Sequence, residues 1–150
     1  KVVLNLAPAQ RVSSALLETV DVLIMNEVEA GTLSGEAGQP LALARNLSNR
    51  HHLVAVVTLG GDGAVAVAKD QVWSVGALPV RVVDTVGAGD AFVGVMAAML
   101  DRQAPLPTAL HRASVAAGMA CEARGAQSAL PIDLDVDGRL GDLPPPRLVT

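Results

Sequence analysis

The run LVAVVTL, residues 53–59, is the feature that most restricts how this chain can fold. It is continuously apolar and rich in β-branched residues, a pattern typical of a strand buried on both faces of a sheet. The run ends at GGDG, residues 60–63, and the apolar segment AVAVA follows at once, so we expect a turn back into a second strand. The sequence therefore predicts a sheet with a buried centre.

Short apolar runs alternate with segments of helical periodicity along the rest of the chain. We expect further strands at 2–6, 21–26, 71–75 and 80–83, and helices at 14–20 (capped by Ser13 or Ser14), 27–35, 40–50, 88–102 and 107–123. Strands that alternate with helices indicate an α/β fold with a largely parallel sheet. From Pro131 the composition shifts to Asp, Gly and Pro, so we expect a domain over residues 1–130 and a loosely ordered tail over 131–150.

Composition narrows the class of protein. Hydrophobic residues make up 51% of the 150 residues, yet there is one Phe, one Trp and no Tyr, so Val, Leu and Ala must form the core. A net charge of −4 without basic runs argues against a nucleic-acid partner. No apolar stretch reaches the roughly 18 residues of a membrane span, and no signal-peptide pattern opens the chain. With a single cysteine, Cys121, these features favour the cytoplasm. Because an apolar run begins directly after Lys1, we expect a truncated or processed chain.

The segment DTVGAGDAF, residues 84–92, lies between a strand-like run and a helical pattern. The first-turn N–H groups of a helix lack intrahelical partners, and the helix dipole is positive at that end. Small residues at Gly87, Ala88 and Gly89 would let a phosphate, or the charge on a transferring phosphoryl group, approach that backbone. Asp90 could then accept a hydroxyl proton as a general base. Asp84 could hold a cation or brace the loop.

A purely structural interpretation of the same segment stays open. Asp at a helix N-terminus is stabilising in its own right, and small residues are common where a strand turns into a helix. The segment is not a Walker A loop, since no Gly-Lys-Ser/Thr follows.

DTVGAGDAF resembles the second signature of the ribokinase-like (PfkB-type) carbohydrate kinases, in which the GAGD loop is the anion hole and its Asp the catalytic base. Four further segments resemble family motifs in the same order: NLAPA (5–9), NEVEA (26–30, the NxxE motif), VTLGGDG (57–63, the nucleotide-binding turn) and RGAQSALP (124–131, near the monovalent-cation site). Leu6 stands where a proline is usual, and Ala129 where a serine is usual. The GAQ segment favours ribokinase-type members over adenosine kinases or fructokinases.

The resemblance implies ATP-dependent phosphorylation of a sugar primary hydroxyl, as in the conversion of D-ribose to ribose 5-phosphate. Asp90 would be the base, and Gly87 with the N–H groups of Ala88, Gly89 and Asp90 would form the anion hole. Asn26 and Glu29 would position Mg²⁺-ATP through water. The resemblance also implies a nucleotide site with Thr58, Gly60, Gly61, Gly63 and Ser114, and a potassium site with Asp84 and backbone near Val86, Ala120, Ala123 and Gly125.

The fold implied is a three-layer α/β/α arrangement around a largely parallel central sheet, and it is incomplete. The family's N-terminal half, with its glycine-pair sugar-binding segments and small β-sheet lid, has no counterpart in residues 1–150. Family dimers pair through that lid, so a homodimer would need a different surface. Two other functions stay open: a non-catalytic fragment that binds nucleotide or a partner, and a kinase for a nucleoside, fructose or a vitamin such as pyridoxal.

Several of these residues also have structural interpretations. Asn26 can simply cap a helix, and GGDG can be an ordinary hairpin turn. Cys121 lies in an Ala-rich helix and is expected to be a small core residue. The segment DLDVDG, residues 133–138, copies the start of a calcium-binding loop, but its twelfth position is Pro144 where a Glu ligand is required, which argues against calcium.

Overall fold

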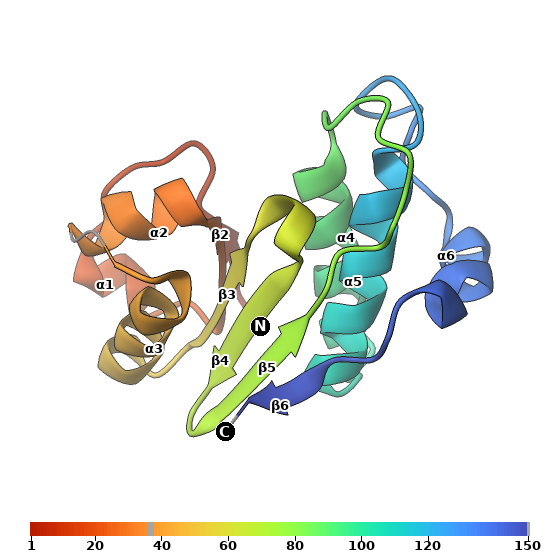
Figure 1. Ribbon diagram of the computed structural model, residues 1–150. Coiled ribbons are helices and arrows are strands. Elements are labelled where there is room, and N and C mark those ends of the chain that lie inside the picture. Colours follow the sequence, from red (N-terminus) through yellow and green to blue (C-terminus); the bar gives the residue numbers. More distant parts are fainter. Residues whose placement is uncertain (36–37, 150) are drawn as a thin grey trace. The chain divides into compact units, whose positions relative to one another are not determined.

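The computed structural model describes residues 1–35 and 38–149 of the chain (Figure 1). The chain forms two compact units. The first contains residues 1–60 and 64–74 and the C-terminal residues from Leu148, and the second contains residues 61–63 and 75–147.

The first unit is built on a sheet whose strand order follows the chain order. Its strands are β1 (Val3–Asn5), β2 (Val22–Asn26), β3 (Val54–Thr58), β4 (Ala64–Ala68), β5 (Gln71–Val75) and β6 (Arg147–Val149). β1, β2 and β3 are parallel, whereas β4 runs antiparallel to β3. The buried strand expected at 53–59 and its return into AVAVA are therefore confirmed, within a mixed sheet.

Three helices connect the parallel strands of this unit (Figure 1). α1 (Ser14–Leu17) joins β1 to β2, while α2 (Glu27–Ser34) and α3 (Pro40–His51) join β2 to β3. Ser13 caps α1 through the N–H of Leu16, as expected, but the helix ends at Leu17 rather than at Val20. α2 ends at Gly35 in a left-handed conformation, which glycine adopts without steric cost.

The core of the first unit follows the two-residue period of its strands. Alternate residues of β2 and β3 (Leu23 and Met25, Ala55 and Val57) join one buried cluster with Leu43, Ala44 and Leu47 of α3. The Ser48 hydroxyl is buried in the same region and donates to the Leu53 carbonyl at 2.7 Å, so this polar group is satisfied.

The second unit is organised around two long helices that pack side by side (Figure 1). α4 (Ala88–Asp101) buries Phe92, Met96 and Leu100 at four-residue spacing, and α5 (Leu106–Ala120) buries a row of alanines. The short elements of the unit are η1 (Gly60–Asp62), α6 (Asp133–Arg139) and η2 (Leu140–Asp142). Both long helices occur where the sequence predicted them.

Two expectations about the second unit are wrong. Residues 80–83 form no strand, because the Val83 N–H bonds to the Cys121 carbonyl beyond α5 rather than to a neighbouring strand. The described part of 131–150 is not loosely ordered, since α6 buries Val136 and the following segment buries Leu143. Arg112 of α5 is 9% exposed and forms ion pairs with Asp133 and Asp137, which fix α6 in place.

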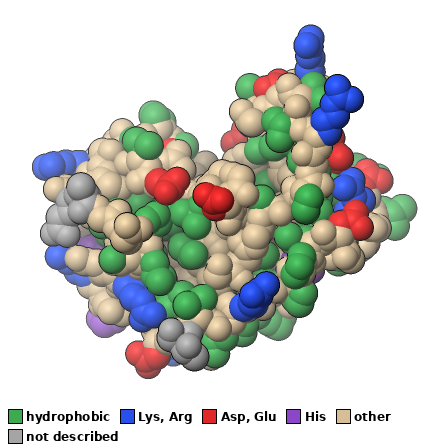
Figure 2. Space-filling model, viewed as in Figure 1, with side chains coloured by type: hydrophobic (Ala, Val, Ile, Leu, Met, Phe, Trp, Pro, Cys, Tyr) green, Lys and Arg blue, Asp and Glu red, His purple; other side chains and the backbone are tan. Residues whose placement is uncertain are grey.

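Two further properties concern the surface. Within residues 1–35 and 38–149, the helices are all too short or too polar to cross a bilayer. On the face shown in Figure 2, Lys and Arg side chains are scattered among hydrophobic and uncharged ones rather than gathered in one patch.

Candidate active site

The loop that precedes α4 depends on one glycine for its shape. Gly87 is the N-cap of α4 and has φ 85°, a conformation that residues with a side chain rarely adopt. A β-carbon at this position would lie 2.7 Å from the carbonyl oxygen of Ala126. The turn therefore requires glycine, and it rests directly on the backbone of the 124–131 segment.

The first-turn amides of α4 are the candidate anion donors. The Ala88 N–H donates a long hydrogen bond of 3.3 Å to the Thr85 carbonyl, and the Ala91 N–H donates to the Gly87 carbonyl at 2.8 Å. Between them, the N–H groups of Gly89 and Asp90 have no acceptor in the described part of the chain. Two adjacent amides at the positive end of a fourteen-residue helix are thus available to an anion.

Asp90 brings a carboxylate to the same turn. It is the third residue of α4, its side chain is exposed, and it makes no ion pair or hydrogen bond with other described residues. A carboxylate so close to two free amides repels a resident anion, but it can take a proton from a group that attacks an anion held there. The turn therefore places two free amides beside an unpaired carboxylate.

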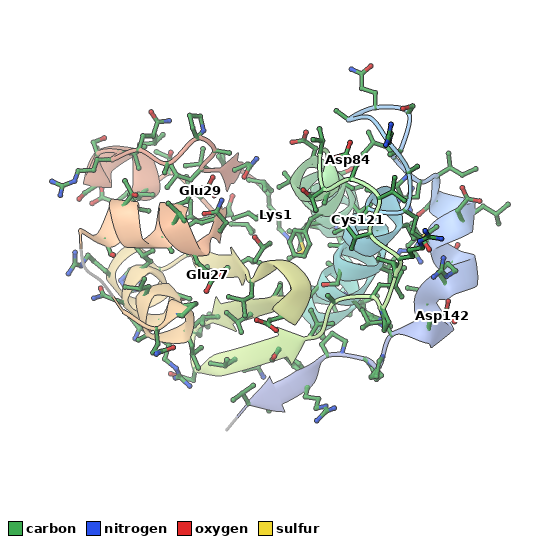
Figure 3. All side chains as sticks on the ribbon, turned by 45° about the horizontal axis from the view of Figure 1, so that its top comes forward. Lys1, Glu27, Glu29, Asp84, Cys121 and Asp142 are labelled. Carbon is green, nitrogen blue, oxygen red and sulfur yellow. The ribbon has the colours of Figure 1, made fainter. Side chains whose placement is uncertain are left out.

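Asp84 holds the loop from the other side (Figure 3). Its Oδ1 accepts the Val86 N–H at 3.1 Å and its Oδ2 accepts the Gly125 N–H at 3.4 Å. These two hydrogen bonds, with smaller contributions from the Thr85 N–H and the charge of Arg124, lower the pKa of the Asp84 carboxyl. Asp84 is therefore a charged brace between the loop before α4 and the segment after α5.

Cys121 contributes to this arrangement through its backbone, which the sequence interpretation missed. Its carbonyl accepts the N–H of Val83 at 2.8 Å and that of Asp84 at 3.3 Å. The thiol donates to the Ala117 carbonyl, and burial, together with the charge of Asp84, raises its pKa. A carbonyl that accepts hydrogen bonds leaves no mark in the residue type, so nothing in the sequence could have signalled this role.

In the first unit, Asn26 and Glu29 cap α2 reciprocally. Asn26 Oδ1 accepts the Glu29 N–H at 2.9 Å, and Glu29 Oε2 accepts the Asn26 N–H at 2.7 Å. Glu29 is only 7% exposed. The helix-cap interpretation of Asn26 is thus confirmed, and it leaves the Asn26 amide nitrogen and Glu29 Oε1 for another role.

Thr58 joins the Asn26 end of the sheet. Thr58 and Asn26 are register partners at the carboxyl ends of two parallel strands, and the Thr58 hydroxyl donates to the Met25 carbonyl at 3.4 Å. In α/β sheets this edge is where ligands bind. The structure therefore brings together Asn26, Glu29 and Thr58, three of the residues that the sequence singled out.

The glycines of the GGDG turn differ in what they require. Gly60 has φ 55°, and a β-carbon at Gly60 or Gly61 would meet no atom within 4 Å, so this backbone is open to another molecule. Gly63 has φ 95°, and a β-carbon there would overlap the Val75 carbonyl and Gly76. Packing alone thus explains Gly63, whereas the open backbone at Gly60 and Gly61 fits a binding role.

The remaining candidates lie along and after α5. Ser114 is 5% exposed, and its hydroxyl has no hydrogen-bond partner among the described residues. Ala120 is buried, Val86 and Ala123 are exposed, and Gly125 has φ 102° beside Asp84. Across residues 1–35 and 38–149 there is no group of three His, Cys, Asp or Glu side chains that could hold a metal ion.

Comparison with known proteins decides the family. Residues 1–133 match the family described as pfkB family carbohydrate kinase. This chain belongs to that family. The five motif segments, which span residues 5–131, fall inside the matched region.

Individual relatives agree with this assignment. The pfkB-family chain is 30% identical to the ribokinase of Staphylococcus aureus, over 87% of this chain and 44% of that protein. The crystal structure of ribokinase from Thermotoga maritima superposes with a TM-score of 0.87 and 28% identity, covering 93% of this chain and 48% of that one. The Arabidopsis thaliana ribokinase complexed with ribose and ATP gives a TM-score of 0.84 and 25% identity, covering 93% and 47%.

The expected ribokinase-like α/β fold is confirmed by these structures. The pfkB-family chain spans less than half the length of each of these three relatives, so it covers only part of the fold. Other relatives of similar identity are a deoxyribokinase of Salmonella typhi and a fructokinase of Klebsiella pneumoniae.

Proposed function

We propose that this chain carries the phosphoryl-transfer centre of an ATP-dependent sugar kinase, and that the acceptor is the primary hydroxyl of ribose. The proposal rests on one feature of the first turn of α4: the unpartnered N–H groups of Gly89 and Asp90 lie beside the unpaired Asp90 carboxylate. Charge stabilisation and a base in one turn are what phosphoryl transfer to an alcohol requires.

The chemistry follows from this geometry. The Asp90 carboxylate accepts the proton of the sugar hydroxyl while the hydroxyl oxygen bonds to the γ-phosphorus of ATP. The bond from that phosphorus to the bridging oxygen breaks, and ADP leaves with the electron pair. The N–H groups of Gly89 and Asp90 hold the charge on the transferring group. The Ala88 N–H can join them, because its present bond to the Thr85 carbonyl is long, at 3.3 Å.

Nucleotide binding is assigned to the residues at the carboxyl ends of β2 and β3. Mg²⁺ accompanying ATP keeps much of its hydration shell, and Glu29 Oε1 and the Asn26 side chain are suited to hold such waters. Thr58, Gly60 and Gly61 offer a hydroxyl and an open backbone, whereas Gly63 serves the shape of the turn. Ser114 is included for its unpartnered hydroxyl. The Arabidopsis relative that was crystallised with ATP supports ATP as the nucleotide.

A monovalent cation such as K⁺ is assigned to the neighbourhood of Asp84. The ligands would be hard oxygens: the Asp84 carboxylate, which already bonds to the N–H groups of Val86 and Gly125, and backbone carbonyls near Val86, Ala120, Ala123 and Gly125. Oxygen donors of this kind suit K⁺. Ala129 supplies no hydroxyl, so the set has one possible ligand fewer than in family members with a serine at this place. A bound cation would offset the charge of Asp84 beside the loop that precedes α4.

The sugar is inferred from the relatives rather than from the site. A ribokinase and a ribokinase–ribose complex among the relatives favour ribose. Relatives of similar sequence identity are named for other sugars, a deoxyribokinase and a fructokinase.

The test is sugar-dependent release of ADP from Mg²⁺-ATP. We would measure it for residues 1–150 and for the whole product of any longer reading frame that contains them, with ribose, deoxyribose, fructose and adenosine as acceptors. We expect ribose to give the greatest stimulation of ADP release. If none of the four stimulates ADP release by the whole product, the kinase assignment is wrong. Nucleotide binding without turnover would then favour a non-catalytic role.

A further inference from the structure

The segment that leads from β5 to α4 contacts the end of α5 and the loop after it at four successive points. We call residues 76–87 the strap; they contain no helix or strand. Leu78 contacts Gly118, the N–H groups of Val83 and Asp84 bond to the Cys121 carbonyl, the Asp84 side chain accepts the Gly125 N–H, and Gly87 contacts Ala126. The strap and the second half of α5, with the loop after it, thus run together up to the first turn of α4.

The first of these contacts depends on the absence of a side chain at position 118. A β-carbon there would lie 2.6 Å from Leu78 Cβ and 3.3 Å from Leu78 Cδ2. Leu78 is 3% exposed, so its side chain fills a closed space. A rotamer change cannot relieve the contact, because the position of Cβ is set by the backbone. Any side chain at position 118 therefore pushes the Leu78 backbone and α5 apart.

Such a movement reaches the loop because little else restrains the strap in between. Pro79 follows Leu78 directly and has a fixed φ, while Arg81, Val82 and Val83 are exposed. The next anchor is the Cys121 carbonyl, which accepts the N–H groups of Val83 and Asp84. Asp84 in turn accepts the Val86 N–H one residue before Gly87. A shift of Leu78 relative to α5 therefore displaces the turn that carries the free amides.

We propose that Gly118 is a positioning residue for the α4 turn: by letting Leu78 sit against α5, it sets where the N–H groups of Gly89 and Asp90 lie. That those amides stabilise a phosphoryl group rests on the function proposed above. The coupling between Gly118 and the loop does not, and it can be measured separately.

The experiment compares Gly118→Ala with Gly138→Ala by amide hydrogen exchange and ¹H–¹⁵N NMR on residues 1–150. Both positions are helical, and alanine has the higher helix propensity at both. A β-carbon at Gly138 meets no atom within 4 Å, which makes it the matched control. Leu78→Ala is the second variant, because it loosens the same contact without overpacking it.

In Gly118→Ala, we expect exchange of the Val83 and Asp84 amides to rise about tenfold or more, with shifted resonances for Gly87 to Asp90. The amides of β2 and β3 should be unchanged. Leu78→Ala should give the same pattern in weaker form, and Gly138→Ala should give none of it. Unchanged loop amides in both strap variants, or an equal change in the control, would overturn the proposal.

Kinetics then separate positioning from general structure. In the product that transfers phosphoryl groups, Gly118→Ala should lower kcat about tenfold or more with the KM for ATP nearly unchanged. A parallel rise in KM with normal kcat would contradict positioning. If the wild type transfers nothing, the proposed function is wrong, and the exchange comparison alone still decides the coupling.

Discussion

Gly87 and Gly89 belong to the same short motif, yet only the first requires a glycine. Gly87 has φ 85° and no room for a β-carbon beside Ala126. Gly89 is helical, and a β-carbon there would meet no atom within 4 Å. Shape therefore explains Gly87, whereas the backbone at Gly89 is open, as the proposed function requires.

Two alanine substitutions should therefore change stability in opposite directions. Gly87→Ala should lower the free energy of unfolding by about 2 kcal/mol or more, since it combines a left-handed backbone with a steric overlap. Gly89→Ala should raise it by up to about 1 kcal/mol through helix propensity. Urea denaturation of the two variants measures this difference. Equal free energies of unfolding would show that Gly87 is not under steric constraint.

Asn26 caps α2 and is also proposed to contact a ligand, and substitutions can separate the two roles. Asn26→Ala should cost about 1 kcal/mol of stability, while Asn26→Ser, which keeps an N-cap acceptor, should stay within a few tenths of a kcal/mol of the wild type. The serine variant loses the amide nitrogen, so its affinity for Mg²⁺-ATP should fall. Unfolding curves and a nucleotide titration test the two roles. Wild-type affinity in the serine variant would leave Asn26 as a cap only.

The role of a residue can be predicted from sequence when it depends on the side chain, but not when it depends on the backbone. The N-cap at Asn26 and the glycine turn before α4 follow from residue type and were predicted. The acceptor role of the Cys121 carbonyl was not, because every residue has such a carbonyl. Nor could the sequence show that the Ala88 amide already has a partner at Thr85.

At the scale of elements, α6 was missed because its segment, rich in Asp, Gly and Pro, is typical of disorder. Order comes instead from contacts distant in sequence: Val136 is buried, Arg112 binds Asp133 and Asp137, and the His111 ring bonds to the Leu143 carbonyl at 2.8 Å. Arg139 adds ion pairs with Glu122 and Asp142. A local composition argument cannot anticipate such partners.

Removing the two carboxylates of α6 should lower the stability of the protein more than removing Arg112. The carboxylates are more than half exposed, whereas the Arg112 side chain is 11% exposed. Replacing both Asp133 and Asp137 with Asn leaves a buried cation unpaired and should cost about 3 kcal/mol. Arg112→Met leaves only exposed carboxylates and should cost about 1 kcal/mol or less. Urea unfolding measures both variants, and a more harmful Arg112→Met would show that packing of the guanidinium stem dominates.

For α6 the sequence missed an element that is present. At 80–83 it predicted a strand that the structure does not form. Val80, Val82 and Val83 have the β-branched character of a strand, and the run follows Pro79 as a strand can. These residues instead form the middle of the strap, where the Val83 N–H finds its acceptor at the end of α5. Propensity describes which backbone shapes a segment tolerates, and the available partner decides between them.

At the scale of the molecule, the α/β class and most of the strands and helices followed from the alternation of apolar periods. Family membership followed from five motifs in order, and the match over residues 1–133 agrees with it. The GAQ segment favoured ribokinase-type members, but sequence patterns did not identify the sugar, because this chain spans less than half the length of the ribokinases that it matches.

The central claim is that Asp90 is the base in phosphoryl transfer. The most direct test is to compare wild type and Asp90→Asn, in the product that carries transfer activity, for transfer of γ-labelled phosphate to sugar and for affinity for Mg²⁺-ATP. We predict a loss of transfer of about 10²-fold or more, with nucleotide affinity within a few fold of the wild type. Near-normal transfer by Asp90→Asn would show that Asp90 is not the base and that its place in α4 serves only the helix.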